Sequence, residues 1–188
     1  MNKKQELLEK IAELFYKNGY EATSIRQICR NLGMTSAGLY YHFKNKQEML
    51  FEIMNSAIED ALVSMRRELG KKSGAEDKIE WIIRAHIMFY CKNKCQTKVL
   101  VHERGTLENE YAEIIREKER EYVQVIRKVL MQITLENGRD VPVDAAVFYL
   151  LGTLNWIVHW FDPGGKISPD ELADSVTTLF MNGVKGKT

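Results

Sequence analysis

The chain has 188 residues, of which 45% are hydrophobic and 28% charged, a composition that suits one compact domain or a small head joined to a larger body. Its net charge of +1 does not by itself predict a nucleic-acid partner. The polar N-terminal segment argues against a signal peptide and the three cysteines against a disulfide framework, so we expect a cytoplasmic protein with reduced thiols.

The spacing of apolar residues is helical along the chain, and only three residues are proline, so we expect an all-α fold. Charge is unevenly distributed over this fold. Residues 1–50 carry eight Lys and Arg against five Asp and Glu, whereas the remainder carries 19 against 21. A basic front joined to an acidic back indicates that only the front meets a polyanion.

Three short helices are predicted at the front. The first, over residues 3–18, ends at Gly19, and its inward stripe consists of Leu7, Leu8, Ile11, Ala12 and Phe15. Thr23 or Ser24 caps the second helix, and Ser24 would form a capping box with Gln27. Gly33 then separates this helix from a third that starts at Thr35. Two short helices joined by a tight glycine turn predict a helix-turn-helix.

Longer helices follow in the rest of the chain. Asn45 caps a helix that reaches residue 69, and residues 70–77 form a linker. The next predicted helices cover residues 75–92, 95–103, 106–136 and 142–161. In the last helix, Ser168 is the cap and Glu171 completes a capping box, and the helix ends near Gly183.

The segment TSAGLYYHFKNK, residues 35–46, carries a glycine inside a helix, which costs about 1 kcal/mol relative to alanine, next to a run of aromatic residues. If this third helix lies against DNA, Gly38 lets the backbone approach the bases, and tyrosine hydroxyls donate to phosphates. Thr35 and Ser36 would offer free N–H groups at the helix start, and Lys46 would meet an anion at the next helix. Packing or solvation explains each residue singly, but the combination inside a helix-turn-helix favours DNA.

The segment LFYKNGYEATSIRQICRNLGMTSAGLYYHFKNKQEML resembles the DNA-binding head of the tetracycline-repressor (TetR) family over roughly the first 50 residues. The resemblance implies an all-helical homodimer with a three-helix DNA-binding head, residues 1–48, and a helical ligand-binding and dimerisation body, residues 49–188. By position, the implied DNA contacts are Ser24, Arg26, Thr35, Ser36, Ala37, Gly38, Tyr40, Tyr41, His42 and Lys46.

Within this set, Lys46 matches the phosphate-binding lysine of the family. Ala37 and Gly38 stand where many members carry larger polar residues. We therefore expect few direct base contacts, chiefly from Ser36 and one tyrosine, with help from DNA shape.

The helix over residues 142–161 is apolar nearly all round, so it must be buried on more than one side. A membrane span is disfavoured because four polar residues interrupt it, namely Asp144, Thr153, Asn155 and His159. We expect this helix and the last one to form a homodimer interface of four helices. Two heads roughly 34–36 Å apart would then reach successive major grooves of a palindromic double-stranded operator.

The segment NWIVHWFDPGGKISPDEL resembles the tail of a TetR subgroup that regulates fatty-acid degradation and responds to long-chain acyl-CoA. This resemblance implies an apolar tunnel in the body and a repressor that a small hydrophobic effector releases from DNA. Ten residues could line the tunnel, although core or dimer packing explains them at least as well. They are Trp81, His86, Phe89, Tyr90, Tyr122, Tyr149, Asn155, Trp156, His159 and Trp160.

A metal or thiol sensor of the same fold is an alternative, as is a small helical enzyme. The sensor would use His86, Cys91, Cys95, His102 and Glu103, but Lys92 and Lys94 would repel a cation, and the sequence contains no CxxC or HExxH motif. The enzyme lacks a GxSxG, P-loop or GxGxxG motif, and the possible base His159 with Asp162 has no evident nucleophile. We therefore expect no metal site, no cofactor and no catalytic activity.

Overall fold

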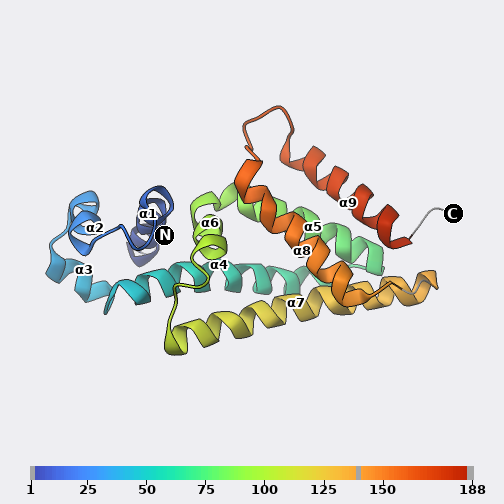
Figure 1. The fold of residues 1–188 in the computed structure, drawn as a ribbon, viewed down its shortest axis with the longest axis horizontal. Coiled ribbons are helices and arrows are strands. Elements are labelled where there is room, and N and C mark those ends of the chain that lie inside the picture. Colours follow the sequence, from blue (N-terminus) through green and yellow to red (C-terminus); the bar gives the residue numbers. More distant parts are fainter. Residues whose placement is uncertain (1–2, 139–140, 186–188) are drawn as a thin grey trace. The chain divides into compact units, whose positions relative to one another are not determined.

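The computed structural model describes residues 3–138 and 141–185, and these residues form nine α-helices (Figure 1). The predicted all-α fold is confirmed. The helices are α1 Lys3–Asn18, α2 Ile25–Leu32, α3 Ser36–His42, α4 Lys46–Leu69, α5 Ala75–Lys92, α6 Lys94–His102, α7 Asn109–Asn137, α8 Val143–Trp160 and α9 Pro169–Lys185. Among the described helices, none is long and apolar enough to cross a lipid bilayer.

The chain packs as two compact units, each made of two segments. The first unit contains the described residues up to Glu59 and the segment Asn93–Glu117. The second contains Asp60–Lys92 and the described residues from Lys118 onward. The long helices α4 and α7 therefore each contribute to both units.

In the first unit, α1 packs against α2 and, more extensively, against α6, although some 75 residues of chain separate α1 from α6. Lys98 of α6 lies 4.8 Å from the ring centre of Tyr16 on α1 and donates a hydrogen bond to its hydroxyl at 3.3 Å. The predicted stripe of α1 is buried throughout, with Ile11 and Ala12 fully inaccessible. The helix α6 is thus a structural part of the unit that contains the helix-turn-helix.

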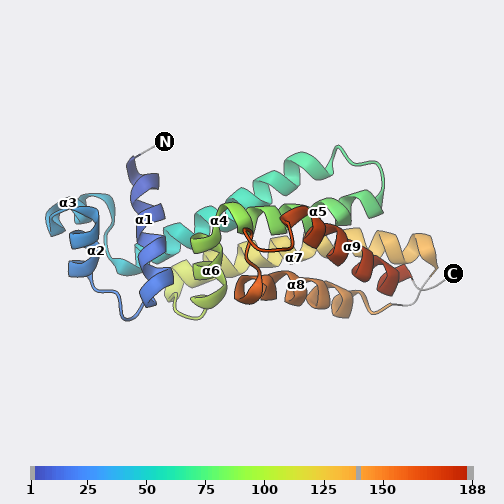
Figure 2. The same ribbon diagram turned by 90° about the horizontal axis from the view of Figure 1, so that it is seen from above.

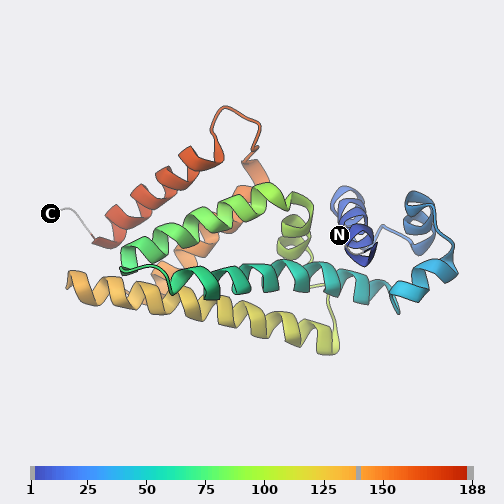
Figure 3. The same ribbon diagram turned by 180° about the vertical axis from the view of Figure 1, so that it is seen from behind.

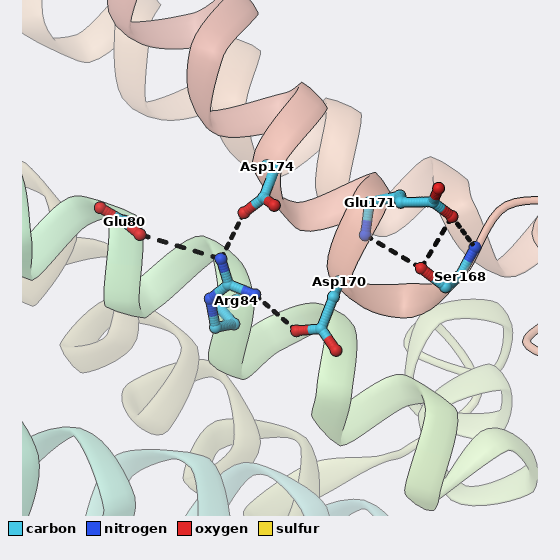
Figure 4. Close-up of polar contacts among 6 residues, drawn as sticks. All are labelled: Glu80, Arg84, Ser168, Asp170, Glu171 and Asp174. Atoms are coloured by element: carbon cyan, nitrogen blue, oxygen red, sulfur yellow. Dashed lines mark hydrogen bonds and ion pairs between the residues drawn. The ribbon is translucent and has the colours of Figure 1, made fainter.

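The second unit is built around α5, which packs against both α8 and α9 (Figure 2). Arg84 of α5 donates to Asp170 at 2.6 Å and also to Asp174, so that one guanidinium holds two carboxylates of α9 (Figure 4). Nearby, the predicted capping box of α9 is confirmed, because Glu171 N donates to Ser168 Oγ at 3.2 Å and Ser168 N donates to Glu171 Oε2 at 2.8 Å. The C-terminal part of α4 runs beside α7, where Arg66 donates to Glu121 at 2.7 Å (Figure 3).

The helix α8 has one buried and one exposed face in the single chain. Its buried residues are Ala146, Val147, Leu150, Leu154, Ile157 and Val158. Its other face exposes large rings, with 61% of Phe148, 70% of Tyr149, 62% of Trp156 and 52% of Trp160 accessible to solvent. The single chain therefore buries one face of this helix, and the prediction that it is buried on a second side stays a prediction.

The start of α7 differs from the prediction by three residues. Helical spacing predicts a start near Thr106, whereas the helix begins at Asn109, which has a positive φ of 50°. Thr106 N donates to the Glu103 carbonyl at 3.0 Å, and the Thr106 hydroxyl donates to the Glu103 carboxylate at 2.9 Å. These hydrogen bonds fold residues 103–106 into a turn, which delays the helix.

Candidate nucleic-acid interface

The helix-turn-helix is fixed by caps at each of its ends. Ser24 and Gln27 form the predicted capping box of α2, with Gln27 N donating to Ser24 Oγ at 3.2 Å and Ser24 N donating to Gln27 Oε1 at 2.7 Å. Gly33 ends this helix in the left-handed conformation at φ 62°, and Met34 N donates back to the Cys29 carbonyl at 3.0 Å. The positive φ explains why glycine is needed at this turn.

The third helix is anchored by its inner face and exposes its outer face. Leu39 and Phe43 are buried, as are Ile28 and Cys29 of α2, the helix against which α3 packs. On the outer face, 49% of Tyr40 and 85% of Tyr41 are accessible. Exposed rings on so short a helix do not stabilise the core of this unit, so they are available to a partner.

All ten predicted DNA contacts lie in the first unit, on α2, α3, their caps and the start of α4. Seven of them are exposed: Ser24, Arg26, Thr35, Ser36, Ala37, Tyr40 and Tyr41. Gly38, His42 and Lys46 are partly exposed. Residues 22–47 contain Arg26, Arg30, Lys44 and Lys46 and no Asp or Glu, so this whole segment presents positive charge without a carboxylate of its own.

Two of the predicted hydroxyl contacts already take part in capping. The Ser24 hydroxyl accepts from Gln27 N and donates to Gln27 Oε1 at 2.9 Å. The Thr35 hydroxyl accepts from Gly38 N at 3.1 Å, which leaves its own O–H as a donor. Of these two residues, Thr35 can therefore donate to a phosphate without giving up its cap, whereas Ser24 must first release Gln27.

Gly38 has ordinary space around it. A Cβ placed at this position would lie 3.4 Å from Thr35 Oγ1 and 3.5 Å from Met34 Cε, which are ordinary van der Waals distances, and the residue is not in the left-handed conformation. Neither packing nor backbone geometry within the described residues requires a glycine here. Nothing within the described residues therefore explains why the helix carries a glycine that lowers its stability relative to alanine.

Lys46 lies in the first turn of α4, which Asn45 caps by accepting from Glu48 N at 2.8 Å, as predicted. Its Nζ lies 4.0 Å from the ring centre of Tyr20 and 3.4 Å from the Glu21 carbonyl oxygen. Partial burial lowers the pKa of Lys46, and the charges of Glu21 and Glu103 act in the opposite direction. Among the described residues, the ammonium is thus held by a ring and a carbonyl rather than by a carboxylate ion pair.

The ten predicted ligand-lining residues do not form one cluster in the single chain. Trp81, His86, Phe89 and Tyr90 lie on α5 and Tyr122 on α7, all wholly or partly buried. The other five lie exposed on α8: Tyr149, Asn155, Trp156, His159 and Trp160. Two predicted residues are paired, since His86 Nδ1 lies 3.1 Å from the Tyr122 hydroxyl. Tyr90 instead donates to the Phe161 carbonyl at 3.2 Å.

The cysteines and acids give the sensor alternative little support. In the part of the chain that the structure describes, no group of three or more His, Cys, Asp or Glu side chains could hold a metal ion. None of the three cysteines, all of which the structure describes, takes part in a disulfide. Burial raises the pKa of Cys95, which disfavours the reactive thiolate.

Sequence reasoning missed Tyr20 and Gln47, which contact the region around Lys46. The Tyr20 ring is only 4% exposed, and Gln47 Nε2 donates to the Thr106 carbonyl at 2.9 Å. Tyr20 falls in the GYEAT segment that precedes α2, but nothing in that segment indicates a contact with a lysine 26 residues later. Such a contact depends on tertiary packing alone.

Comparison with known proteins covers both ends of the chain. Residues 7–53 match the family described as "Bacterial regulatory proteins, tetR family", and residues 72–184 match "Tetracyclin repressor-like, C-terminal domain". The chain is 24% identical to the HTH-type transcriptional repressor KstR2 of Rhodococcus jostii, with 97% of this chain and 91% of that protein covered. It is 20% identical to the fatty acid metabolism regulator protein of Bacillus subtilis, with 98% and 97% covered.

Solved structures agree with these matches. The crystal structure of AibR in complex with isovaleryl coenzyme A and operator DNA superposes with a TM-score of 0.86 at 27% identity, covering 95% of this chain and 97% of AibR. The TetR-family regulator PfmR from Thermus thermophilus gives a TM-score of 0.86 at 28% identity, covering 94% and 97%. This chain therefore belongs to the TetR family and is a DNA-binding transcriptional repressor rather than an enzyme.

Proposed function

We propose that this repressor acts in the cytoplasm as a homodimer on a palindromic operator and that a hydrophobic acyl-CoA releases it. Residues 1–48 act as the DNA-binding head, and residues 49–188 bind the effector and form the dimer. The observation that carries the DNA part is the segment of residues 22–47, which combines exposed Tyr40 and Tyr41 with four basic residues and no acid.

In this proposal α3 lies in the major groove. Tyr41 and the Thr35 hydroxyl donate to phosphates, Lys46 contacts a phosphate beside α4, and Ser36 with one tyrosine reads base edges. In this arrangement DNA explains the glycine at position 38, because a residue without a Cβ lets the helix backbone lie closer to the bases. Few side chains then read sequence directly, and DNA shape supplies the remaining specificity.

The exposed face of α8 supports the dimer. It carries Phe148, Tyr149, Trp156 and Trp160, and on α9 Leu179 is 76% exposed. Contiguous apolar surface of this kind marks an interaction site on a water-exposed protein. A second copy of the chain is the occupant we propose, because a twofold contact matches this face with itself and positions two heads on a palindrome.

The buried pair His86 and Tyr122 supports a neutral, hydrogen-bonding effector. Burial lowers the pKa of His86 to about 4 and raises the pKa of Tyr122, so both side chains are uncharged at neutral pH. An uncharged donor among apolar residues suits a carbonyl such as that of a thioester better than a charged group. We propose that Trp81, Phe89 and Tyr90 contact the acyl chain and that the exposed rings of α8 contact the partner subunit instead.

The class of effector is further supported by likeness. AibR, to which this chain is 27% identical, was crystallised with isovaleryl coenzyme A and operator DNA. The tail segment NWIVHWFDPGGKISPDEL resembles a subgroup that responds to long-chain acyl-CoA. We propose that the effector carries a long acyl chain. The experiment compares it with an effector that carries a short branched chain.

A titration of the purified protein on its operator, followed by fluorescence anisotropy, tests the proposal. Linkage requires that an effector lower the affinity of the protein for DNA by the same factor by which DNA lowers its affinity for the effector. Palmitoyl-CoA should release the operator, whereas free coenzyme A and palmitate should not. Release by isovaleryl-CoA alone would reassign the chain length, and no release by any acyl-CoA would remove the effector while leaving the DNA-binding function intact.

A further inference from the structure

The turn between α6 and α7, residues 103–106, is hydrogen-bonded to two segments of the head. The Glu103 carboxylate accepts from Tyr20 N at 3.1 Å, and the Thr106 carbonyl accepts from Gln47 Nε2 at 2.9 Å. Tyr20 lies just before α2, and Gln47 is the neighbour of Lys46 in α4. The turn is therefore hydrogen-bonded both to Tyr20, whose ring contacts the Lys46 ammonium, and to Gln47, the neighbour of Lys46 in the chain.

We infer that Glu103 is a positioning residue for DNA binding, which fixes the Tyr20 ring and through it the Lys46 ammonium. The inference rests on the proposed contact between Lys46 and a phosphate and adds a residue from outside the helix-turn-helix to that contact. Glu103 itself does not touch DNA in this arrangement. It acts through the backbone of Tyr20, whose ring centre lies 4.0 Å from Lys46 Nζ.

The Tyr20 ring is held on several sides. It is 4% exposed and packs edge-on against Phe15 with 5.1 Å between the ring centres. Burial, together with the charges of Glu21, Glu108 and Glu103, raises the pKa of Tyr20 to about 12, and a hydrogen bond from Gln47 acts against this rise. A rigid ring is a suitable support for a lysine, because a cation over an aromatic face keeps its full charge for a second partner.

Both oxygens of the Glu103 carboxylate are occupied. One accepts from Tyr20 N, and the other accepts from the Thr106 hydroxyl at 2.9 Å. The same residue thus orders the turn and connects it to the head. The helix that leads into this turn, α6, is itself packed along α1, so the position of the carboxylate is fixed from both directions.

The charge and the position of Glu103 have opposite effects on DNA binding. The carboxylate is negative and acts on Lys46 through its charge, so removing that charge should strengthen binding to a polyanion. Removing the hydrogen bond to Tyr20 should weaken binding, because the ring and the ammonium lose their fixed position. The sign of the effect therefore separates a positioning role from simple electrostatics.

Three variants test the inference by operator affinity over a range of salt concentrations. Glu103→Gln removes the charge and keeps an acceptor, so it should bind as tightly as the wild type or slightly more tightly. Glu103→Ala removes both and should weaken binding several-fold, with the slope of log K against log salt reduced by about one per head. Glu108→Ala removes a nearby exposed charge that acts on Tyr20 through space, and it should not weaken binding. If Glu103→Ala bound as tightly as Glu103→Gln, the inference would be wrong.

Further variants distinguish a failure of this inference from a failure of the proposed function. Lys46→Ala tests the phosphate contact itself, and an unchanged salt slope would overturn both that contact and the inference. In the Lys46→Ala background, Glu103→Ala should have no further effect on DNA affinity. Independent, additive effects of the two substitutions would overturn the positioning role alone. Tyr20→Phe should keep the affinity and Tyr20→Leu should lower it, with thermal unfolding confirming that each variant is folded.

Discussion

The hydroxyl of Tyr122 on α7 lies 3.1 Å from Nδ1 of His86 on α5, and the two rings meet edge-to-face with 6.2 Å between their centres. Each residue as a whole is partly exposed, but the polar end of each side chain is enclosed, which is why the two pKa values shift in opposite directions. The pair brings hydrogen-bonding groups into a mainly apolar part of the second unit.

Removal of the Tyr122 hydroxyl should weaken the effector response without weakening operator binding. Tyr122→Phe keeps the ring and takes away the group that we propose to bind the thioester carbonyl. The expected result is a higher acyl-CoA concentration for half-release and an unchanged operator affinity when no effector is present. Trp81→Phe, a conservative change beside the proposed acyl chain, serves as the matched control and should alter the response much less.

Acidification should destabilise the protein through His86. Because the folded-state pKa is about 4 and the unfolded value is 6.5, the unfolded chain binds more protons between these two pH values. Stability from this residue is therefore complete above pH 6.5 and is lost as the pH falls, by roughly 2 kcal/mol at about pH 5. Urea unfolding of the wild type and of His86→Gln, above pH 6.5 and at about pH 5, measures this contribution. An equal loss of unfolding free energy in the two proteins would contradict the role of His86.

Gly38→Ala should separate folding from DNA binding. A Cβ at Gly38 meets neighbours only at ordinary contact distances, so the substitution should raise the free energy of unfolding by about 0.5–1 kcal/mol. The same methyl group lies on the helix that we propose to enter the major groove, so operator affinity should fall. Denaturant unfolding and anisotropy titration measure the two effects, and a variant with unaltered affinity would argue against a close approach of this backbone to the bases.

Charges placed on the exposed face of α8 and α9 should separate the proposed dimer. Trp156→Asp combined with Leu179→Asp puts two carboxylates on surface that is 62% and 76% exposed in the single chain, so each subunit should still fold. Sedimentation equilibrium should then report a monomer with weakened operator binding. Val63→Asp, on an exposed position of α4, is the control and should leave the association state unchanged.

Arg84 should contribute only modestly to stability despite its several partners. Its guanidinium contacts Asp170, Asp174 and Glu80, but all three carboxylates are more than half exposed, so water and salt screen the attraction (Figure 4). We expect Arg84→Met to cost about 1 kcal/mol at low salt and less at high salt. A loss of several kcal/mol, or one independent of salt, would show that the contact acts mainly by packing.

Most helix boundaries could be predicted because caps and periodicity are local. Ser24 with Gln27 and Ser168 with Glu171 are readable as capping boxes, and both form as expected. The start of α7 could not be predicted, because apolar spacing does not reveal the hydrogen-bonded turn between Glu103 and Thr106 that precedes the helix.

The two candidate sites also differ in how far the sequence predicts them. The helix-turn-helix is a short contiguous motif, so its exposed positions could be predicted one by one. In the body, helical spacing groups residues on a face but does not say whether that face meets the interior or a partner. The sequence therefore groups Tyr149 and Trp156 with His86, whereas in the structure both are exposed and His86 is partly buried.

The packing of α6 on α1 makes the unit that contains the helix-turn-helix discontinuous along the chain. Its second segment, Asn93–Glu117, leaves the ribosome only after all of α5 has been synthesised. The packing of this unit on α1 is therefore completed only after the second segment has emerged, and a chimaera that grafts residues 1–59 onto another protein would lack the helix that covers one side of α1. We therefore expect a graft of this unit between relatives to be more stable when both segments are transplanted together.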